Sequence, residues 1–152
     1  MNELSELYQE LILDHTRNPR NRRKMAAGCR KAEGYNPLCG DRVTLYVDLD
    51  NGIIRDVSFE GSGCAISTAS VSLLTGALKG KSAAEAKKIF ADFHDLVTGK
   101  VEAGCDLGKL EVFSGVREFP MRVKCATLAW HTLNAALENR ETPVTTEGVE
   151  DK

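Results

Sequence analysis

Three cysteines and one aspartate stand at places in this sequence where they could bind a metal ion together. Cys39 and Asp41 are separated by a single glycine, Cys64 follows Gly-Ser-Gly, and Cys125 follows Arg-Val-Lys. Three thiolates and one carboxylate make a chemically sound tetrahedral Zn(II) site. Because a hard carboxylate oxygen beside soft sulfurs holds zinc less inertly than four thiolates do, this donor set suits a site that exchanges a ligand or its metal.

The elements expected around these cysteines give them different roles. We expect Cys64 and Cys125 at or just before the first residues of two helices, over about 65–78 and 124–138. The free N–H groups and the positive dipole end at a helix start stabilise anions, so both thiols should have a lowered pKa. Cys39 lies instead in a loop, and we expect it to be the ligand that can move.

A purely structural role stays open for each cysteine on this reasoning. A single buried cysteine is more often a small core residue than a ligand, and the five cysteines include no C-x-x-C pair. Cys29 and Cys105 have weaker contexts and are predicted to be non-ligands. We expect His15 to pack in the core, and the turn of the helix to point His131 away from Cys125.

The first half of the chain alternates between a helix and strands. Apolar residues at helical spacing predict a helix over 3–17, and residues 18–38 read as a basic, irregular stretch. Residues 43–49 alternate between apolar and polar, which predicts a half-buried strand. The Asn-Gly pair at 51–52 predicts a hairpin turn into a return strand over 54–59.

The second half is predicted to be helical. Ser82 and Glu85 form the capping box of a helix over 82–97, and a short helix is expected near 107–113, before the last helix. The order helix, antiparallel strands, helices predicts an α+β domain in which a small antiparallel sheet of about three strands packs against helices. We expect one domain over 1–140 and a disordered polar tail over 141–152.

Composition excludes several function classes. A net charge of −2 over 152 residues makes no electrostatic case for binding nucleic acid or an anionic membrane. No apolar run approaches the roughly 20 residues of a transmembrane helix. The first residues are acidic and amphipathic, unlike a secretory signal peptide, so we expect a cytoplasmic protein whose cysteines are thiols or metal ligands.

Three segments carry a resemblance to a known family. PLCGD (37–41), GSGCAIS (61–67) and RVKCATL (122–128) resemble the signature segments of the U-type iron–sulfur cluster assembly proteins, the IscU/NifU-N/SufU family. The resemblance covers about residues 3–138 and implies an IscU/SufU-like fold.

Within that family the sequence is most similar to the SufU branch. Lys124 stands directly before Cys125, where IscU-type scaffolds carry a histidine. FPMRVK (119–124) replaces the Leu-Pro-Pro-Val-Lys stretch that chaperones recognise in those scaffolds. The long segment between Cys64 and Cys125 also resembles the SufU insertion.

The resemblance implies a zinc-dependent sulfurtransferase. Such a protein takes persulfide sulfur from a PLP-dependent, SufS-like cysteine desulfurase and passes it to a downstream Suf assembly scaffold. Carried over by position, Cys39 is the catalytic sulfur acceptor and Arg122 assists it. Asp41, Cys64 and Cys125, together with Cys39, are the ligands of the Zn(2+) ion.

Two other functions remain open. The same four residues could hold iron or a transient [2Fe-2S] cluster in a scaffold that assembles and transfers it, because cysteine sets are the usual ligands of such clusters. The third possibility is a structural zinc protein that acts as an interaction module. In a structural zinc protein of this kind, replacing Cys39 would change only the stability of the fold.

Overall fold

The structure, a computed structural model, describes residues 3–25, 29–37, 40–100, 107–139 and 144–145, with the side chains of 3–8 and 117–118 left out. The predicted α+β class is confirmed, with the N-terminal helix first. In chain order the elements are α1 (Glu3–Arg17), β1 (Arg30–Asn36), β2 (Asp41–Asp50), β3 (Ile53–Ser62), α2 (Ala65–Leu78), α3 (Ala83–Val97), the 3-10 helix η1 (Gly108–Glu118), α4 (Pro120–Leu137) and β4 (Val144–Thr145).

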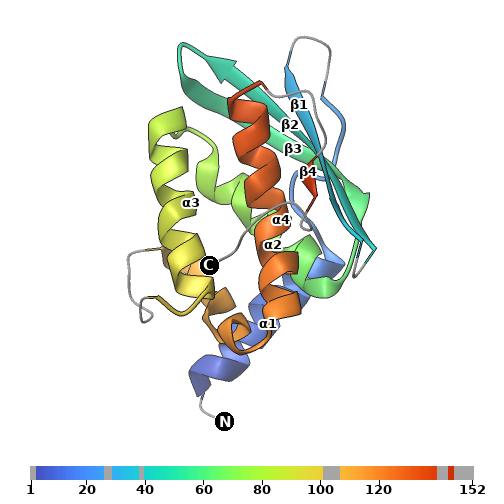
Figure 1. Ribbon diagram of the computed structural model, residues 1–152, viewed down its shortest axis with the longest axis vertical. Helices are drawn as coiled ribbons and strands as arrows, with labels where there is room; N and C mark the ends of the chain where they lie inside the picture. The colour runs from blue at the N-terminus through green and yellow to red at the C-terminus, as the bar shows by residue number, and fades with distance from the viewer. Residues whose placement is uncertain (1–2, 26–28, 38–39, 101–106, 140–143, 146–152) are drawn as a thin grey trace.

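The described strands form one sheet in the order β3-β2-β1-β4 (Figure 1). β2 pairs antiparallel with both β1 and β3, and β4 pairs parallel with β1. The predicted hairpin is confirmed, because Asn51 and Gly52 join β2 to β3 with φ angles of 52° and 79°. Two consecutive positive φ values match the right-handed twist of the paired strands.

Strand β1 corrects the expectation that residues 18–38 are irregular. Its inward-facing residues are Ala32, Gly34 and Asn36, and the residues between them are exposed. Because small or polar residues occupy the buried positions, the alternating hydrophobic pattern that predicts a strand is missing. Strand β4 lies within the stretch that the sequence assigned to the polar tail, so the sheet has a strand beyond residue 140.

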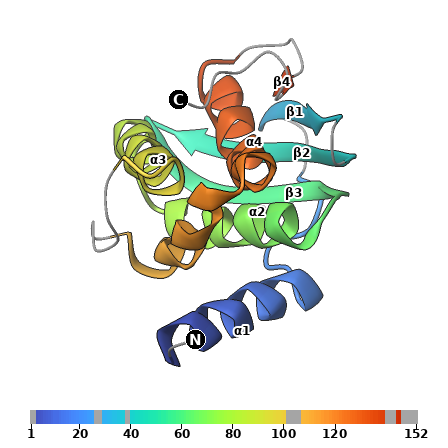
Figure 2. The ribbon, with the colours of Figure 1, turned by 60° about the horizontal axis from the view of Figure 1, so that its bottom comes forward.

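The helices cover one face of the sheet in two layers (Figures 1 and 2). Helix α4 packs on β1 and β2, α2 packs on β3 and on α4, and α1 lies on the outer side of α2. The core between them includes Trp130, which is fully buried and stacks on Phe93 with the ring centroids 4.8 Å apart. No helix in the described part of the chain is long and apolar enough to cross a membrane.

The sequence predicted the start of α3 correctly but not that of α4. The capping box of α3 is confirmed: Ser82 Oγ accepts the Glu85 N–H at 3.0 Å, and Glu85 Oε1 accepts the Ser82 N–H at 3.0 Å. Helix α4, expected from about residue 124, begins at Pro120 instead. Proline is favoured in the first turn of a helix, where its missing N–H costs no hydrogen bond. Cys125 therefore lies inside α4, in its second turn.

Candidate metal centre

The fold brings three of the four predicted ligands together. The ligand atoms of Asp41, Cys64 and Cys125 all lie within 4.8 Å of one another. Asp41 is the first residue of β2, and β3 returns antiparallel so that Ser62 ends opposite Arg42, two residues before Cys64. Helix α4 supplies Cys125 from the layer above. Cys39, the fourth predicted ligand, lies outside the described residues.

The carboxylate of Asp41 is fully buried and hydrogen-bonded on both oxygens. Oδ1 accepts the backbone N–H of Cys64 at 2.8 Å, and Oδ2 accepts the side-chain amide of Asn36 at 3.3 Å. Cys64 Sγ lies 3.9 Å from Oδ2. A buried carboxylate is unfavourable unless it is hydrogen-bonded, paired with a cation or bound to a metal. The two donors account for its orientation, and the two neighbouring sulfurs complete a cation-binding set.

Gly63 makes room for this carboxylate. A Cβ atom added at residue 63 would lie 2.7 Å from Asp41 Oδ1, which is closer than real Cβ contacts. Any other residue would push the Asp41 side chain out of its place beside Cys64. Gly63 does not have a positive φ angle, so close packing against Asp41, and not the backbone conformation of the turn, favours glycine here.

Cys64 occupies the helix start that the sequence predicted. It is the N-cap residue of α2, and its Sγ accepts the backbone N–H of Ser67 at 3.4 Å. Its pKa is lowered to about 7, first by its hydrogen bond with Cys125 and then by the N–H groups of Ser67 and Ile66. Burial and the negative charge of Asp41 act in the opposite direction. The half-buried Cys64 thus holds a substantial thiolate fraction at neutral pH.

Cys125 differs from the expectation. It lies in the second turn of α4 and is 2% exposed, so the free N–H groups of a helix start do not act on it. Its Sγ instead accepts the side-chain amide of Asn36 at 3.5 Å. The helix-start explanation therefore holds for Cys64 alone among the described cysteines.

Asn36 is a site residue that the sequence reasoning missed. It ends β1, is fully buried, and donates to both Asp41 and Cys125. Residues that hold metal ligands in place in this way strongly influence metal affinity. In the sequence, Asn36 stands directly before Pro37 and the predicted ligands Cys39 and Asp41, which could have drawn attention to it. Because β1 was not predicted as a strand, nothing in the sequence indicated that the Asn36 side chain points inward.

The remaining candidate residues lie around this centre or apart from it. Arg122 is exposed in the first turn of α4, three residues before Cys125, with its guanidinium 4.8 Å from the Phe119 ring centroid. Cys29 is half-buried just before β1, and Cys105 lies outside the described residues. His131 packs edge-on against Phe90 between α4 and α3.

The donor set fits a soft or borderline divalent metal. Two cysteines, one with its pKa lowered to about 7, and a buried carboxylate match the ligands that Zn(II) takes. Cysteine sulfurs also ligate iron in iron–sulfur clusters. The described donors are two sulfurs and one carboxylate, so the centre does not resemble the oxygen-only sites of Mg²⁺ or Ca²⁺.

Comparison with known proteins identifies the family. The sequence profile described as NifU-like N terminal domain matches residues 7–126. The zinc-dependent sulfurtransferase SufU of Bacillus subtilis is 42% identical over 91% of this chain and 94% of its own length. The iron-sulfur cluster assembly scaffold protein IscU of Streptococcus pyogenes is 39% identical over 91% of this chain and 87% of its own length.

A solved structure supports the same assignment. FiSufU from Fervidobacterium islandicum superposes with a TM-score of 0.81 at 39% identity, covering 87% of this chain and 97% of that chain. Because the profile and these relatives span most of the sequence, the chain belongs to the NifU-like N-terminal domain family, which includes SufU and IscU proteins. The family predicted from the three sequence segments is confirmed.

Proposed function

We propose that this chain acts in iron–sulfur cluster assembly as a zinc-dependent sulfurtransferase. It accepts persulfide sulfur from a PLP-dependent cysteine desulfurase and passes it to a downstream assembly scaffold. The observation that carries this proposal is the convergence of Asp41, Cys64 and Cys125 within 4.8 Å. The 42% identical relative named as a zinc-dependent sulfurtransferase supports the choice of activity.

The residues would divide the work between holding a metal and accepting sulfur. Asp41, Cys64 and Cys125 would hold Zn(2+), with Cys39 as the fourth ligand. Zinc, when bound, would keep the cysteine thiols deprotonated near neutral pH. The hydrogen bonds from Asn36 to Asp41 and Cys125 would keep these two ligands in place while Cys39 leaves and returns to the zinc ion.

Sulfur transfer then needs one thiolate that can leave its ligand position. Cys125 is buried, and moving Cys64 would break its bond with the Ser67 N–H, so both are poor candidates. Cys39 is assigned the acceptor role because the sequence, with proline at 37 and glycine at 40, predicts a loop there. Its thiolate attacks the terminal sulfur of the donor persulfide; a new S–S bond forms on Cys39, and the donor cysteine leaves as a thiolate with no net oxidation.

Arg122 is proposed to assist this step. Its side chain is exposed in the turn of α4 that precedes Cys125, and residues three apart lie on the same side of a helix. A guanidinium there would favour the anionic persulfide that forms on Cys39. The role requires the Arg122 side chain to leave the ring of Phe119, over which it now lies.

A scaffold for a [2Fe-2S] cluster is the second candidate, because the relative named as an IscU scaffold is nearly as similar, at 39% identity. The same donors could ligate iron. Purification without oxygen separates the two. A cluster scaffold shows visible charge-transfer absorption, whereas a zinc sulfurtransferase is colourless and contains one zinc per chain by elemental analysis.

The deciding experiment follows the sulfur atom. The zinc-loaded protein is incubated with a SufS-like desulfurase and cysteine, and its peptides are analysed by mass spectrometry under non-reducing conditions. We expect the added sulfur on the peptide that contains Cys39 and none on the peptide that contains Cys29. Sulfur on Cys64 instead would reject Cys39 as the acceptor.

Variants complete this experiment. Cys39→Ala should abolish stimulation of the desulfurase while the chain stays folded and keeps much of its zinc, and the matched control Cys29→Ala should behave as the unmodified protein. A Cys39→Ala protein that loses only stability, with desulfurase stimulation intact, would favour the structural zinc module.

A further inference from the structure

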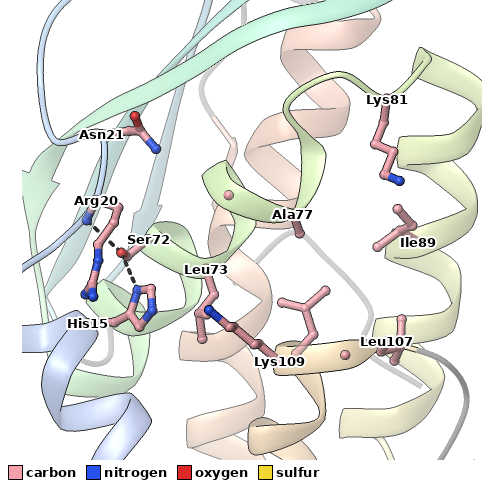
Figure 3. Close-up of a pocket in the computed structure, with 13 residues that line it drawn as sticks. His15, Arg20, Asn21, Ser72, Leu73, Ala77, Lys81, Ile89, Leu107 and Lys109 are labelled. Atoms are coloured by element: carbon pink, nitrogen blue, oxygen red, sulfur yellow. Dashed lines mark hydrogen bonds between the residues drawn. The ribbon is translucent and has the colours of Figure 1, made fainter.

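A cavity separate from the metal centre lies between α1, α2, α3 and η1. Its volume is about 580 Å³, which is within the usual range of small-molecule sites. Figure 3 shows the side chains that line it, and none of the three described metal ligands is among them. The cavity therefore needs an explanation of its own.

The wall of the cavity is apolar and its rim is basic. Leu73 and Leu110 are buried in the wall, and Ile89 of α3 is half-buried beside them. Arg20, Lys81 and Lys109 stand at the rim, and the described lining residues include no aspartate or glutamate. For a chain with a net charge of −2, this is a local excess of positive charge.

Most polar groups at one end of the cavity already have partners inside the protein. Ser72 Oγ accepts the backbone N–H of Arg20 at 2.8 Å and lies 2.7 Å from His15 Nδ1. The Arg20 guanidinium forms an ion pair with Asp14 at 2.7 Å. These groups form a preformed polar end of the cavity, and Asp14 offsets the charge of Arg20.

Among the described lining residues, Lys81 and Lys109 are the charged groups left to meet a ligand. Figure 3 shows Lys109 reaching from η1 toward Leu73, and Lys81 pointing toward Ile89 on the other side. Glu85, near Lys81, offsets part of its charge, as the lowered pKa of the Glu85 carboxyl shows, chiefly from Ser82 hydrogen bonds and in part from Lys81. Lys109 is therefore the main positive group available over the apolar wall.

We propose that this cavity binds a small amphipathic anion, an organic carboxylate with an apolar body. Its carboxylate lies at Lys109, with Lys81 as the second cation, and its apolar body covers Leu73, Ile89 and Leu110. A basic rim selects against cations of the same shape, and an apolar wall selects against small hydrophilic anions. The proposal is independent of the sulfur-transfer function, because the cavity shares no described residue with the metal centre.

Three probes with the same chain and different head groups test the proposal on the zinc-loaded full-length protein. Octanoate, 1-octanol and octylamine are titrated below their aggregation limits, and binding is followed by ¹H–¹⁵N NMR. We expect octanoate to shift the amide signals of α2 and η1, and to bind about tenfold more tightly than octanol, as one partly screened charge contact provides. Octylamine should not bind. Equal binding of all three, or shifts confined to other surfaces, would overturn the proposal.

Two variants and a control locate the site. Lys109→Gln should weaken octanoate binding about tenfold and leave octanol binding unchanged, because only the charge contact is lost. Ala77→Leu, on the cavity side of α2, should weaken both probes by filling the space. The control Lys31→Gln replaces an exposed lysine of β1 outside the cavity and should change neither. An octanoate affinity unaffected by Lys109→Gln would reject the assigned head-group site.

The same variants separate this proposal from the sulfur-transfer proposal. Lys109→Gln and Ala77→Leu should accept sulfur on Cys39 as the unmodified protein does. Octanoate binding without sulfur acceptance would refute only the proposed function, and sulfur acceptance without octanoate binding would refute only the cavity assignment.

Discussion

The candidate metal centre and the basic cavity are built in opposite ways. At the candidate centre the ligand groups are buried or half-buried and held by hydrogen bonds: Asp41 by a backbone N–H and by Asn36, and Cys64 by the N–H of Ser67. At the cavity the charged groups are exposed lysines over an apolar wall. The first arrangement preorganises donor atoms for a compact cation, and the second provides adaptable charge for a larger ligand.

Removing the proposed zinc ion should have the largest effect of any change at either region. Asp41, Cys64 and Cys125 come from β2, the start of α2 and α4, so a bound metal cross-links segments that are remote in sequence. Because binding to the folded state stabilises it, a chelator should lower the melting temperature by about 10 °C. Differential scanning calorimetry measures this shift.

Two ligand variants serve as the controls for this prediction. Cys64→Ala and Cys125→Ala should melt near the temperature of the chelated protein and respond little to added chelator. Identical melting curves with and without chelator in the unmodified protein would show that these residues do not form a stabilising metal site.

Asn36→Ala should have the next largest effect. It removes the amide that donates to Asp41 and Cys125, and it leaves a buried carboxylate oxygen with one partner fewer. Loss of a hydrogen bond to a buried charged group costs about 1–3 kcal/mol in the free energy of unfolding. Urea unfolding of the metal-free protein measures the change, and Asn18→Ala, at an exposed position of similar chemistry, should change it by much less.

Gly63→Ala tests how tightly the carboxylate is held. The added methyl group would meet Asp41 Oδ1 at 2.7 Å, so the carboxylate or the backbone beside it must shift, which changes the spacing between the carboxylate and the two sulfurs. We expect zinc affinity to fall about tenfold, within the range seen when groups that orient metal ligands are altered. Competition with a chromophoric chelator measures the affinity. Gly76→Ala is the matched control, because a Cβ there meets no atom within 4 Å; equal zinc affinity in both variants would contradict the assigned role of Gly63.

The smallest predicted effect belongs to the cavity region. Burial, followed by the positive charges of Arg20 and Lys109, lowers the pKa of His15 below its ordinary value of 6.5. The unfolded chain therefore binds this proton at a higher pH than the folded protein does, so His15 makes stability fall as the pH drops below about 6.5. Above that pH both states are neutral at this residue and the contribution is constant.

Urea midpoints at pH 7.5 and 5.5 measure this effect. The unmodified protein should lose more stability between the two values than His15→Gln, which cannot take up the proton. A steeper loss in His15→Gln would reverse the assigned sign. Asp92→Asn, which changes an exposed ion pair on α3, controls for general charge effects.

Local signals in the sequence predicted several parts of the fold and site. The bounds of α1 and α2, the Asn51-Gly52 turn and the Ser82 capping box depend on residues close together in the chain, and all are confirmed. The same is true of Cys64 at the start of α2. The family could be predicted from three short segments because the residues that define each segment are close together along the chain.

Only the tertiary structure decided the remaining features. Whether Pro120 ends a loop or starts a helix depends on the packing of α4 against the sheet. Because α4 begins at Pro120, Cys125 lies in the buried second turn and not at the helix start. Strand β1 exists through its pairing with β2, although its buried residues give no hydrophobic pattern, and so Asn36 could not be placed beside Asp41 in advance. The cavity joins residues from four elements. The physical reason is common to all three: sequence patterns report on neighbours along the chain, whereas these features arise from contacts between segments remote in sequence.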